Sequence, residues 1–379
     1  MGFIFQERKA RRINMKQGTE KTKVLHLVES FGGGVYTIVK AITESTCEEF
    51  DVTLAFAWRP ETPRDFMKKM NPNVHLIPLE NFEREINPLK DMKALAEAKR
   101  LIKSIQPDIL HLHSSKAGII GRVAVNCKNI PVMYTPHGYS FQKKDDSFWK
   151  CMVYKYIEKI AAKMCGITVA CSKGEWLTAK TITNRATYVN NGINIEHLPV
   201  KKVSPKTKYR FCTIGRICMQ KNPSMFNQIA QAFPEEEFTW IGDGELSNLI
   251  TSDNITITGW KEPKKATELL AQQDIFLLPS LWEGLSVALL EAMYLKCICI
   301  ASRIPGIKEV IEHGVNGFLA EKLEDYIQII REILDGVYDL ESIAERAHQD
   351  VIENYTLNVM CDGYKRLYKE LGEKSERFD

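Results

Sequence analysis

The chain has 379 residues, which is too long for one ordinary domain and suits two domains of about 150–200 residues each. Hydrophobic residues make up 44% of the sequence and charged residues 26%, which is typical of a globular protein in water. The net charge of +3 is too small to indicate a nucleic-acid-binding protein, and no uncharged apolar run is long enough to predict a transmembrane helix.

The ten cysteines form no Cys-x-x-Cys pair and no cysteine–histidine spacing typical of a zinc site. We therefore interpret them as buried thiols of a protein in a reducing compartment, and we expect no metal site. Cys297 and Cys299 lie in an apolar, strand-like run and are expected to face the core together.

Residues 1–22 are basic and show no regular hydrophobic period, so we expect a disordered leader, with Met1 and Met15 both open as the natural start. They lack the apolar region of a signal peptide. A strand is predicted at 23–29, followed by the turn Gly32-Gly33-Gly34 and a helix to about residue 46. This turn lets a ligand approach the backbone closely, but it is not the GxGxxG fingerprint of an NAD site.

The next part of the chain alternates strands with helices. Strands are predicted at 51–58, 74–78, 108–113, 132–138, 166–171 and 187–194. This alternation predicts a parallel sheet covered by helices on both faces, and ligands of such sheets bind beyond the carboxyl ends of the strands. Ser114, Lys116 and His137 are expected at these ends, although a single histidine is more often structural than functional.

A helix is predicted at 148–164, with apolar residues on one side and Lys155, Lys159 and Lys163 on another. The apolar side comprises Trp149, Met152, Val153, Tyr156, Ile157, Ile160 and Met164. We expect this side to pack on the core while the lysines face water. The alternative is that the helix leans on an anionic membrane.

Residues 200–209 contain proline and lysine without an apolar period and are the predicted domain boundary. A second series of strands is predicted at 209–215, 238–242, 255–259, 274–278, 297–302 and 317–320, and a terminal helix at 354–370. Arg216 and Lys221 follow the first of these strands, where two cations are able to hold a diphosphate from two sides. The alternative is a pair of solvated surface charges.

The stretch 274–295 predicts a strand, a tight turn and a buried helix. The first amide groups of such a helix bind anions well, so we expect a phosphate near Gly284 to Val287. Glu291 lies about 8 Å further along the helix axis, a distance that suits the ribose of a nucleotide. Without more information, Glu283 and Glu291 are also compatible with two carboxylates placed there by chance.

Glu283 and Glu291 form an E-x7-E pattern, with Gly284 after the first glutamate and Ala292 after the second. This pattern resembles the signature of retaining, nucleotide-sugar-dependent glycosyltransferases of family 4. The resemblance spans about residues 23–371 and is most specific in the second half. It implies the GT-B fold, in which two Rossmann-like α/β/α domains face each other across a cleft.

The implied domains are an acceptor domain at 23–200, a nucleotide-sugar donor domain at 201–354, and a terminal segment at 355–379 that returns to the first domain.

The resemblance also implies roles for individual residues. His137, in a Thr-Pro-His-Gly string, and Glu283 are the implied catalytic residues. The implied diphosphate site comprises Arg216, Lys221, Gly284, Leu285, Ser286 and Val287. The implied ribose and base site comprises Glu291, Gly242, Gly259 and Trp260. The implied acceptor side comprises Gly32, Gly33, Gly34, Ser114, Lys116 and Asn191.

The implied reaction moves a hexosyl or N-acetylhexosaminyl group from a nucleoside-diphosphate sugar, expected to be UDP-linked, to a lipid-linked or saccharide acceptor. The first half most resembles enzymes of bacterial capsule and exopolysaccharide assembly. The nucleotide sugar is a co-substrate, and no further cofactor is expected. Because the chain has no Asp-x-Asp, we expect cationic side chains to replace a metal at the leaving diphosphate. We expect a cytoplasmic protein that touches the inner face of the plasma membrane.

No second carboxylate is an evident nucleophile at the roughly 5 Å that a double displacement needs, so we favour a same-face, ion-pair-like substitution. Three other functions remain open from the sequence. These are a nucleotide-sugar epimerase on the same fold, a catalytically silent nucleotide-binding homologue, and a Rossmann oxidoreductase, which the missing fingerprint disfavours. The sequence does not identify the sugar, the base or the acceptor.

Overall fold

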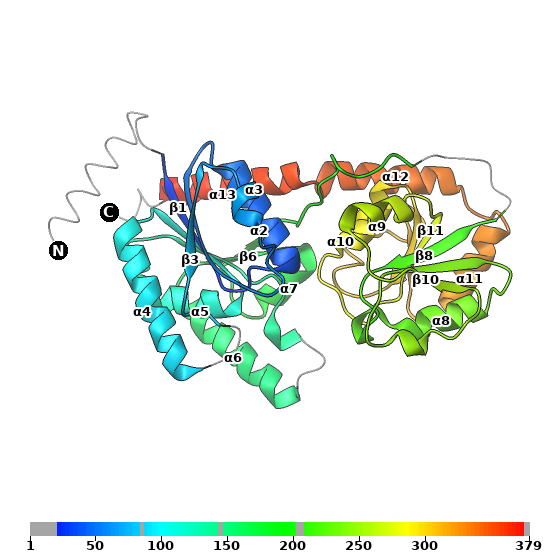
Figure 1. Ribbon diagram of the computed structural model, residues 1–379, viewed down its shortest axis with the longest axis horizontal. Coiled ribbons are helices and arrows are strands. Elements are labelled where there is room, and N and C mark those ends of the chain that lie inside the picture. The colour runs from blue at the N-terminus through cyan, green and yellow to red at the C-terminus, as the bar shows by residue number, and fades with distance from the viewer. Residues whose placement is uncertain (1–20, 84–86, 143–146, 202–207, 375–379) are drawn as a thin grey trace. The chain divides into compact units, whose positions relative to one another are not determined.

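The computed structural model describes residues 21–83, 87–142, 147–201 and 208–374 (Figure 1). The chain divides into two compact units. The first comprises Met1–Cys171, Trp176–Val189 and Cys361–Asp379, and the second comprises Ser172–Glu175 and Asn190–Met360. The leader expected at 1–22 lies, apart from its last two residues, outside the described part of the chain, as does most of the boundary expected at 200–209.

The first unit contains a seven-stranded parallel sheet in the order β3-β2-β1-β4-β5-β6-β7. Its strands are β1 (Lys23–Val28), β2 (Asp51–Ala57), β3 (Val74–Leu79), β4 (Ile109–His113), β5 (Val132–Thr135), β6 (Ile167–Ala170) and β7 (Ala186–Tyr188). Its helices are α2 (Gly33–Thr46), α3 (Phe66–Lys69), α4 (Pro88–Ile105), α5 (Ser115–Ala124), α6 (Phe148–Met164) and the larger part of α7 (Lys173–Lys180), with a short 3-10 helix at Ser140–Gln142.

Alternate residues of each strand face opposite sides of this sheet. Leu25 and Leu27 of β1 pack in one hydrophobic cluster with Ala94 of α4 and Ala117 of α5. His26, between the two leucines, faces the other side, where the C-terminal helix α13 (Leu357–Lys374) lies. From Cys361 onward α13 belongs to the first unit, so the end of the chain completes the layer that covers the histidine face.

The second unit contains a six-stranded parallel sheet in the order β10-β9-β8-β11-β12-β13. Its strands are β8 (Arg210–Ile214), β9 (Glu237–Ile241), β10 (Ile255–Ile257), β11 (Ile275–Leu278), β12 (Ile298–Ser302) and β13 (Phe318–Ala320). Its helices are α8 (Pro223–Gln231), α9 (Pro263–Leu270), α10 (Val287–Tyr294), α11 (Leu323–Leu334) and α12 (Leu340–Asn354), with short 3-10 helices at Met219–Lys221 and Ser247–Leu249.

The same alternation divides the core of the second unit into two layers. Phe276 and Leu278 of β11 pack with Leu289 of α10 on one face of the sheet. Ile275 and Leu277 pack with residues of α8 and α11 on the other face. Both units are therefore α/β/α layers around a parallel sheet, as the sequence predicts. The strand predicted at 187–194 ends earlier, at Tyr188, because Ile193 pairs with Thr356 in the second unit.

The apolar side of α6 does not pack on the core, and the sequence-based expectation is wrong here. Trp149, Val153 and Tyr156 are 77%, 56% and 67% exposed, and the other apolar residues of that side are exposed or half-buried. The helix instead buries Ala161, Ala162 and Glu158, because small side chains allow close packing and the glutamate accepts a hydrogen bond from the Tyr134 hydroxyl (2.8 Å). None of the described helices is long and apolar enough to cross a membrane.

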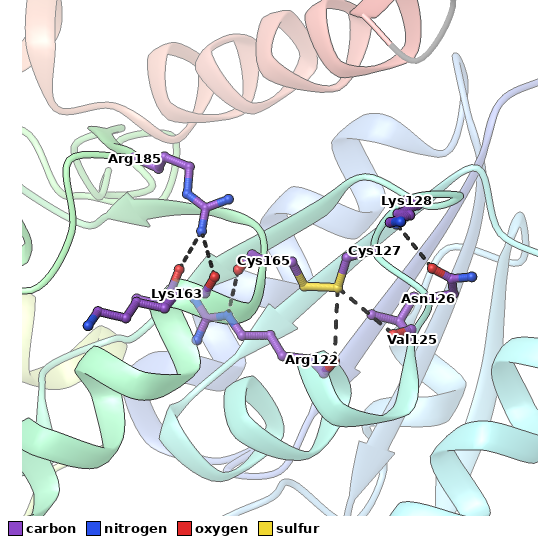
Figure 2. The surroundings of a disulfide bond; sticks show 9 residues. Arg122, Val125, Asn126, Cys127, Lys128, Lys163, Cys165 and Arg185 are labelled. Atoms are coloured by element: carbon purple, nitrogen blue, oxygen red, sulfur yellow. Dashed lines mark hydrogen bonds between the residues drawn. A yellow bond between two sulfur atoms is a disulfide. The ribbon is translucent and has the colours of Figure 1, made fainter. Parts of the chain in front are cut away.

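A disulfide joins Cys127, after α5, to Cys165, directly after α6 (Figure 2). The expectation that all ten cysteines are thiols is therefore wrong for these two. Their separation of 38 residues gave no signal, because only the packing of α5 against α6 brings their Cα atoms to 5.9 Å. Arg185 donates to the Ala162 carbonyl at the same end of α6 (2.6 Å). Eight cysteines are free, and Cys297 and Cys299 are buried in one cluster as predicted.

Candidate active site

Glu283 and Lys221 meet beyond the carboxyl ends of the neighbouring strands β11 and β8 in the second unit. The Lys221 Nζ lies 2.7 Å from Glu283 Oε1, and the two side chains are only 14% and 7% exposed. Ser280 Oγ donates to the same oxygen at 2.8 Å, and Gln220 Nε2 donates to the other oxygen at 3.3 Å. The carboxylate is thus held by three side chains, two of which, Ser280 and Gln220, sequence reasoning missed. Their nearness to Glu283 and Lys221 in the chain was the available signal.

Arg216 follows β8 in the same loop as Lys221, but it has a different partner. Its Nε and Nη2 atoms each donate to a carboxylate oxygen of Glu245, both at 3.0 Å. This pair is largely exposed, so water and salt screen it and a bound anion is able to displace the carboxylate. The two predicted diphosphate ligands therefore each hold a carboxylate in this structure, and Glu245 is a further residue that the sequence did not single out.

Two of the predicted glycine turns, at Gly215 and Gly242, pack against each other at this edge of the sheet. A Cβ atom on Gly242, after β9, would lie 2.1 Å from the Gly215 carbonyl oxygen, after β8. Gly242 also has a φ of 145°, so glycine is required there for both space and conformation. Gly259 follows β10, and Trp260 beside it is 65% exposed.

The helix α10 begins where the sequence predicts, and its N-terminus carries the expected phosphate-binding residues. Ser286 is the N-cap, and its Oγ accepts a hydrogen bond from the Leu289 amide at 3.4 Å. The first amide groups of a helix have no intrahelical acceptor and point out of its N-terminus. Gly284 and Leu285 precede this cap, and Val287 is the first helical residue. A Cβ on Gly306 would lie 2.0 Å from the Gly284 carbonyl, so a second loop closes on this turn.

Glu291 lies in the second turn of α10 and is half-buried. Among the described residues, none forms a hydrogen bond or an ion pair with its carboxyl group. Burial without a counter-charge raises the pKa of its carboxyl group to about 7, because the charged form has lost water and gained nothing in exchange. A ligand with two adjacent hydroxyl groups would supply the missing donors.

His137 lies just beyond β5 in the first unit and has a φ of 53°, which is uncommon for any residue other than glycine. Its Nε2 atom lies 3.0 Å from His113 Nδ1, and its Nδ1 atom lies 3.5 Å from Cys171 Sγ. Burial lowers the pKa of His137 to about 4, so the ring is neutral at physiological pH. A neutral imidazole in a strained, fixed position acts as a hydrogen-bonding group and not as a cation.

Three further histidines, which sequence reasoning did not select, lie close to His137 in the first unit. His26 of β1 pairs in register with His111 of β4, and His113 lies two residues further along β4 on the same face. Their nitrogens lie within 4.8 Å of one another, so these residues offer the geometry of a metal site. The signal was the His-x-His spacing in one strand next to a histidine in its neighbour. The expectation of no metal stays a prediction.

The remaining predicted residues are separate. Gly32 is the N-cap of α2, whereas Gly33 and Gly34, expected in a turn, are the first two residues of the helix, and a Cβ on either of them would meet nothing within 4 Å. Ser114, between β4 and α5, has a φ of 72° and donates its amide to the Thr135 carbonyl at 3.0 Å. The Lys116 ammonium binds Asp91 at 2.6 Å, which gives it a structural partner.

Asn191, predicted on the acceptor side, belongs to the second unit, and its buried Oδ1 atom has no hydrogen-bond donor among the described residues. Its role stays a prediction.

Known proteins resemble the chain over most of its length. Residues 32–197 match the family described as Glycosyltransferase Family 4, and residues 208–336 match Glycosyl transferases group 1. The UDP-Gal:alpha-D-GlcNAc-diphosphoundecaprenol alpha-1,3-galactosyltransferase of Escherichia coli is 30% identical over 324 residues, which are 76% of this chain and 82% of that protein. The capsular polysaccharide biosynthesis glycosyltransferase CapM of Staphylococcus aureus is 23% identical over 82% of this chain and 93% of its own length.

Among solved structures, HepE of Anabaena in complex with UDP and glucose superposes with a TM-score of 0.72 at 16% sequence identity, covering 92% of this chain and 99% of that chain. This likeness concerns the fold. Together with the E-x7-E pattern at the start of α10 and the two parallel-sheet units, these findings establish that the chain belongs to glycosyltransferase family 4 and has the GT-B fold.

Proposed function

We propose that the chain transfers a hexosyl group from a UDP-sugar to a lipid-linked saccharide acceptor in cell-surface polysaccharide assembly, with retention at the anomeric carbon. The observation that carries the proposal is Glu291. Its carboxyl group is desolvated and has no partner among the described residues, it lies one helical turn beyond a helix N-terminus that suits an anion, and a ribose diol would supply two hydroxyl donors to it. The related Escherichia coli enzyme uses UDP-Gal and a GlcNAc-diphosphoundecaprenol acceptor, which supports this substrate class.

In this proposal the leaving diphosphate binds at the N-terminus of α10 and at Lys221 and Arg216. The diphosphate replaces the carboxylate of Glu245 at Arg216 and competes with Glu283 for Lys221. These cations stabilise the negative charge that develops on the leaving group, so the reaction proceeds without a metal. Glu283 then holds hydroxyls of the transferred sugar.

The partners of Glu283 also favour a same-face substitution over a covalent glycosyl-enzyme. Its two carboxylate oxygens are occupied by Lys221, Ser280 and Gln220, and a carboxylate held in this way is a weak nucleophile. The acceptor oxygen therefore attacks from the side on which the diphosphate leaves.

The test is a panel of UDP- and GDP-sugars, assayed for hydrolysis alone and for transfer to a GlcNAc-diphosphopolyprenol acceptor, with and without a chelator. We expect one UDP-hexose to be transferred and NMR of the product to show a retained anomeric configuration. A free sugar inverted at C2 would indicate an epimerase instead. Nucleotide binding without turnover would indicate a silent homologue, and loss of activity in the chelator would contradict the metal-free mechanism.

We also include contact with an anionic membrane in the proposal, since a lipid-linked acceptor lies at a membrane surface. Its support is the exposed apolar side of α6, which carries lysines next to it.

A further inference from the structure

The buried histidines of the first unit form one continuous chain of hydrogen bonds that ends at His137. His137 Nε2 lies 3.0 Å from His113 Nδ1, and His113 Nε2 lies 3.1 Å from His26 Nδ1. His26 Nε2 lies 3.4 Å from the Tyr368 hydroxyl of α13. That hydroxyl lies 2.7 Å from His111 Nδ1.

At each end of this series of hydrogen bonds, the last ring nitrogen also contacts a protein group. His111 Nε2 lies 2.9 Å from Thr135 Oγ1, and His137 Nδ1 lies 3.5 Å from Cys171 Sγ. Every ring nitrogen of these four histidines therefore has a partner. His26, His111 and His113 are fully buried, and burial lowers the pKa of each of them, to about 3 for His26, so all four rings are neutral.

Because the rings are neutral, the donor or acceptor role of each ring determines the role of the next ring. A neutral imidazole has one N–H donor and one bare nitrogen, so in each contact between two rings one ring must donate and the other must accept. If His113 donates from Nδ1 to His137, its own Nε2 must accept from His26, and His26 must then accept from the Tyr368 hydroxyl. If His137 instead donates from Nε2 to His113, every donor and acceptor along the series is reversed, and each contact again has one donor and one acceptor. Which ring nitrogen of His137 carries the proton therefore depends on whether the Tyr368 hydroxyl donates to His26 or accepts from it.

The Cys171 contact is the weakest link, because a thiol forms weak hydrogen bonds. His137 Nδ1 is therefore the nitrogen that a sugar hydroxyl is able to take over, while Nε2 stays bound to His113. Whether Nδ1 donates to that hydroxyl or accepts from it depends on the direction of the chain.

We propose that His113, His26 and Tyr368 are positioning residues that hold His137 in a single tautomer and orientation for sugar transfer. This inference rests on the proposed function for its catalytic consequence, but not for the tautomer itself. It gives the C-terminal helix a direct influence on the site through Tyr368, which is 231 positions beyond His137 in the chain.

The experiment combines ¹⁵N NMR of the eight histidine rings with kinetics on the full-length chain. The ring nitrogen shifts report each tautomer without substrate, so they remain informative even if no UDP-sugar is turned over, an outcome that would defeat only the proposed function. In the wild type we expect one tautomer for His137. His113→Leu should give a mixture of tautomers and lower kcat by about 10- to 100-fold, with the donor KM within about twofold.

Two milder variants keep the test decisive if His113→Leu does not fold. His113→Asn places an amide near the Nδ1 position and should restore most of the activity. Tyr368→Phe removes one hydroxyl and should shift the ring nitrogen signals of His26 and His113. Tyr364→Phe is the matched control, because it removes a buried hydroxyl from the same helix but leaves the chain from His137 to Tyr368 intact.

A single His137 tautomer in His113→Leu, or ring nitrogen shifts of His26 and His113 that stay unchanged in Tyr368→Phe, would overturn the proposal. So would a loss of kcat in Tyr364→Phe equal to that in Tyr368→Phe. Stoichiometric binding of added Zn²⁺ at His26, His111 and His113, seen as large shifts of their ring nitrogens, would also overturn it, since these atoms would then be metal ligands.

Discussion

The candidate sites of the two units differ in how their polar groups are held. In the first unit, neutral imidazoles bond to one another and to Tyr368, so the site is complete without a ligand. In the second unit, Lys221 and Arg216 hold carboxylates that the proposed diphosphate would have to replace or share, and the Glu291 carboxyl group has no partner among the described residues. The first arrangement fixes a geometry, whereas the second holds charged groups that, in the proposed function, act on the bound substrate. Activity, affinity and stability should therefore respond differently to changes in the two units.

The largest effect is expected at Lys221. Lys221→Ala removes a cation from the proposed diphosphate site and leaves the buried carboxylate of Glu283 without its counter-charge. We expect kcat/KM to fall by about 10²- to 10³-fold. Arg216→Ala should cost about tenfold, because that cation is exposed.

Steady-state kinetics with the preferred UDP-sugar provide the measurement, and Lys265→Ala, an exposed lysine of the same unit, is the control. The Arg216→Ala, Lys221→Ala double variant should lose less than the product of the two single losses, since both side chains share one ligand. Strictly multiplicative losses would contradict a shared diphosphate.

The next prediction distinguishes the role of the first unit from that of the second. His137→Gly should lower kcat by about 100-fold because a positioned hydrogen-bonding group is lost at the sugar. Glycine adopts the φ of 53° without strain, so a loss of activity would not reflect backbone distortion. Calorimetric titration with UDP should give an unchanged affinity. An equal fall in UDP affinity would place His137 at the nucleotide instead.

Glu291→Gln should act oppositely on binding and on stability. Losing charge-assisted bonds to the ribose should weaken UDP binding by about 1.5–3 kcal/mol. In the free protein, however, removing a desolvated carboxylate should raise the unfolding temperature at pH 8, where the native carboxyl with its pKa of about 7 is charged at a cost.

The pH dependence of UDP binding follows from the same carboxyl group. Hydroxyl donors favour the charged form, so wild-type affinity should rise as the pH increases from 6 to 8, while the Glu291→Gln variant should show no such rise. Glu235→Gln, the same change at an exposed position, is the control for both experiments. A lower unfolding temperature for free Glu291→Gln would show that the carboxylate has a partner.

The sequence predicted the second site better than the first, and the physical reason is locality. Glu283, the cap of α10 and Glu291 lie within one strand–turn–helix segment, so their spacing already sets their geometry. Lys221 was found through its motif, but its ion pair with Glu283 depends on the adjacency of β8 and β11, which the spacing of residues does not show.

The histidine chain and the disulfide are products of tertiary structure. Tyr368 reaches His26 across 342 positions, and Cys127 meets Cys165 only when α5 packs on α6. The exposure of α6 was missed for a related reason. Hydrophobic periodicity predicts that a helix has an apolar side, but it does not say whether any part of the protein covers that side.

The two units should also respond oppositely to acid. An unfolded histidine has a pKa of about 6.5, and burial lowers the pKa of His26 to about 3, so below pH 6.5 the unfolded chain binds a proton that the folded chain does not. The free energy of unfolding should fall by about 1.4 kcal/mol per pH unit for each such histidine. Glu291 has the opposite sign, because its raised pKa relieves a cost as the pH falls through 7.

Urea unfolding at pH 7 and pH 5.5 provides the measurement. His26→Gln should flatten the loss of stability in acid, and Glu291→Gln should steepen it. Equal slopes in wild type and His26→Gln would show that the buried ring is protonated in the folded state.

The smallest effect concerns α6, where the first unit presents apolar side chains to the outside. An amphipathic surface of this kind suits the interface of an anionic bilayer, and in the proposed membrane contact Trp149 and Tyr156 would enter the headgroup region while the lysines attract the lipid. Changing Lys155, Lys159 or Lys163 singly to Glu should weaken sedimentation with anionic liposomes by about fivefold for each lysine lost, and added salt should reduce the difference. The matched control changes Lys93, Lys99 and Lys103 of α4, which are exposed lysines of the same unit on a helix with fewer exposed apolar residues than α6. If the α4 and α6 variants lose binding equally, the attraction comes from net charge and not from α6. If wild type binds neutral and anionic liposomes equally weakly, the apolar side of α6 faces something other than lipid.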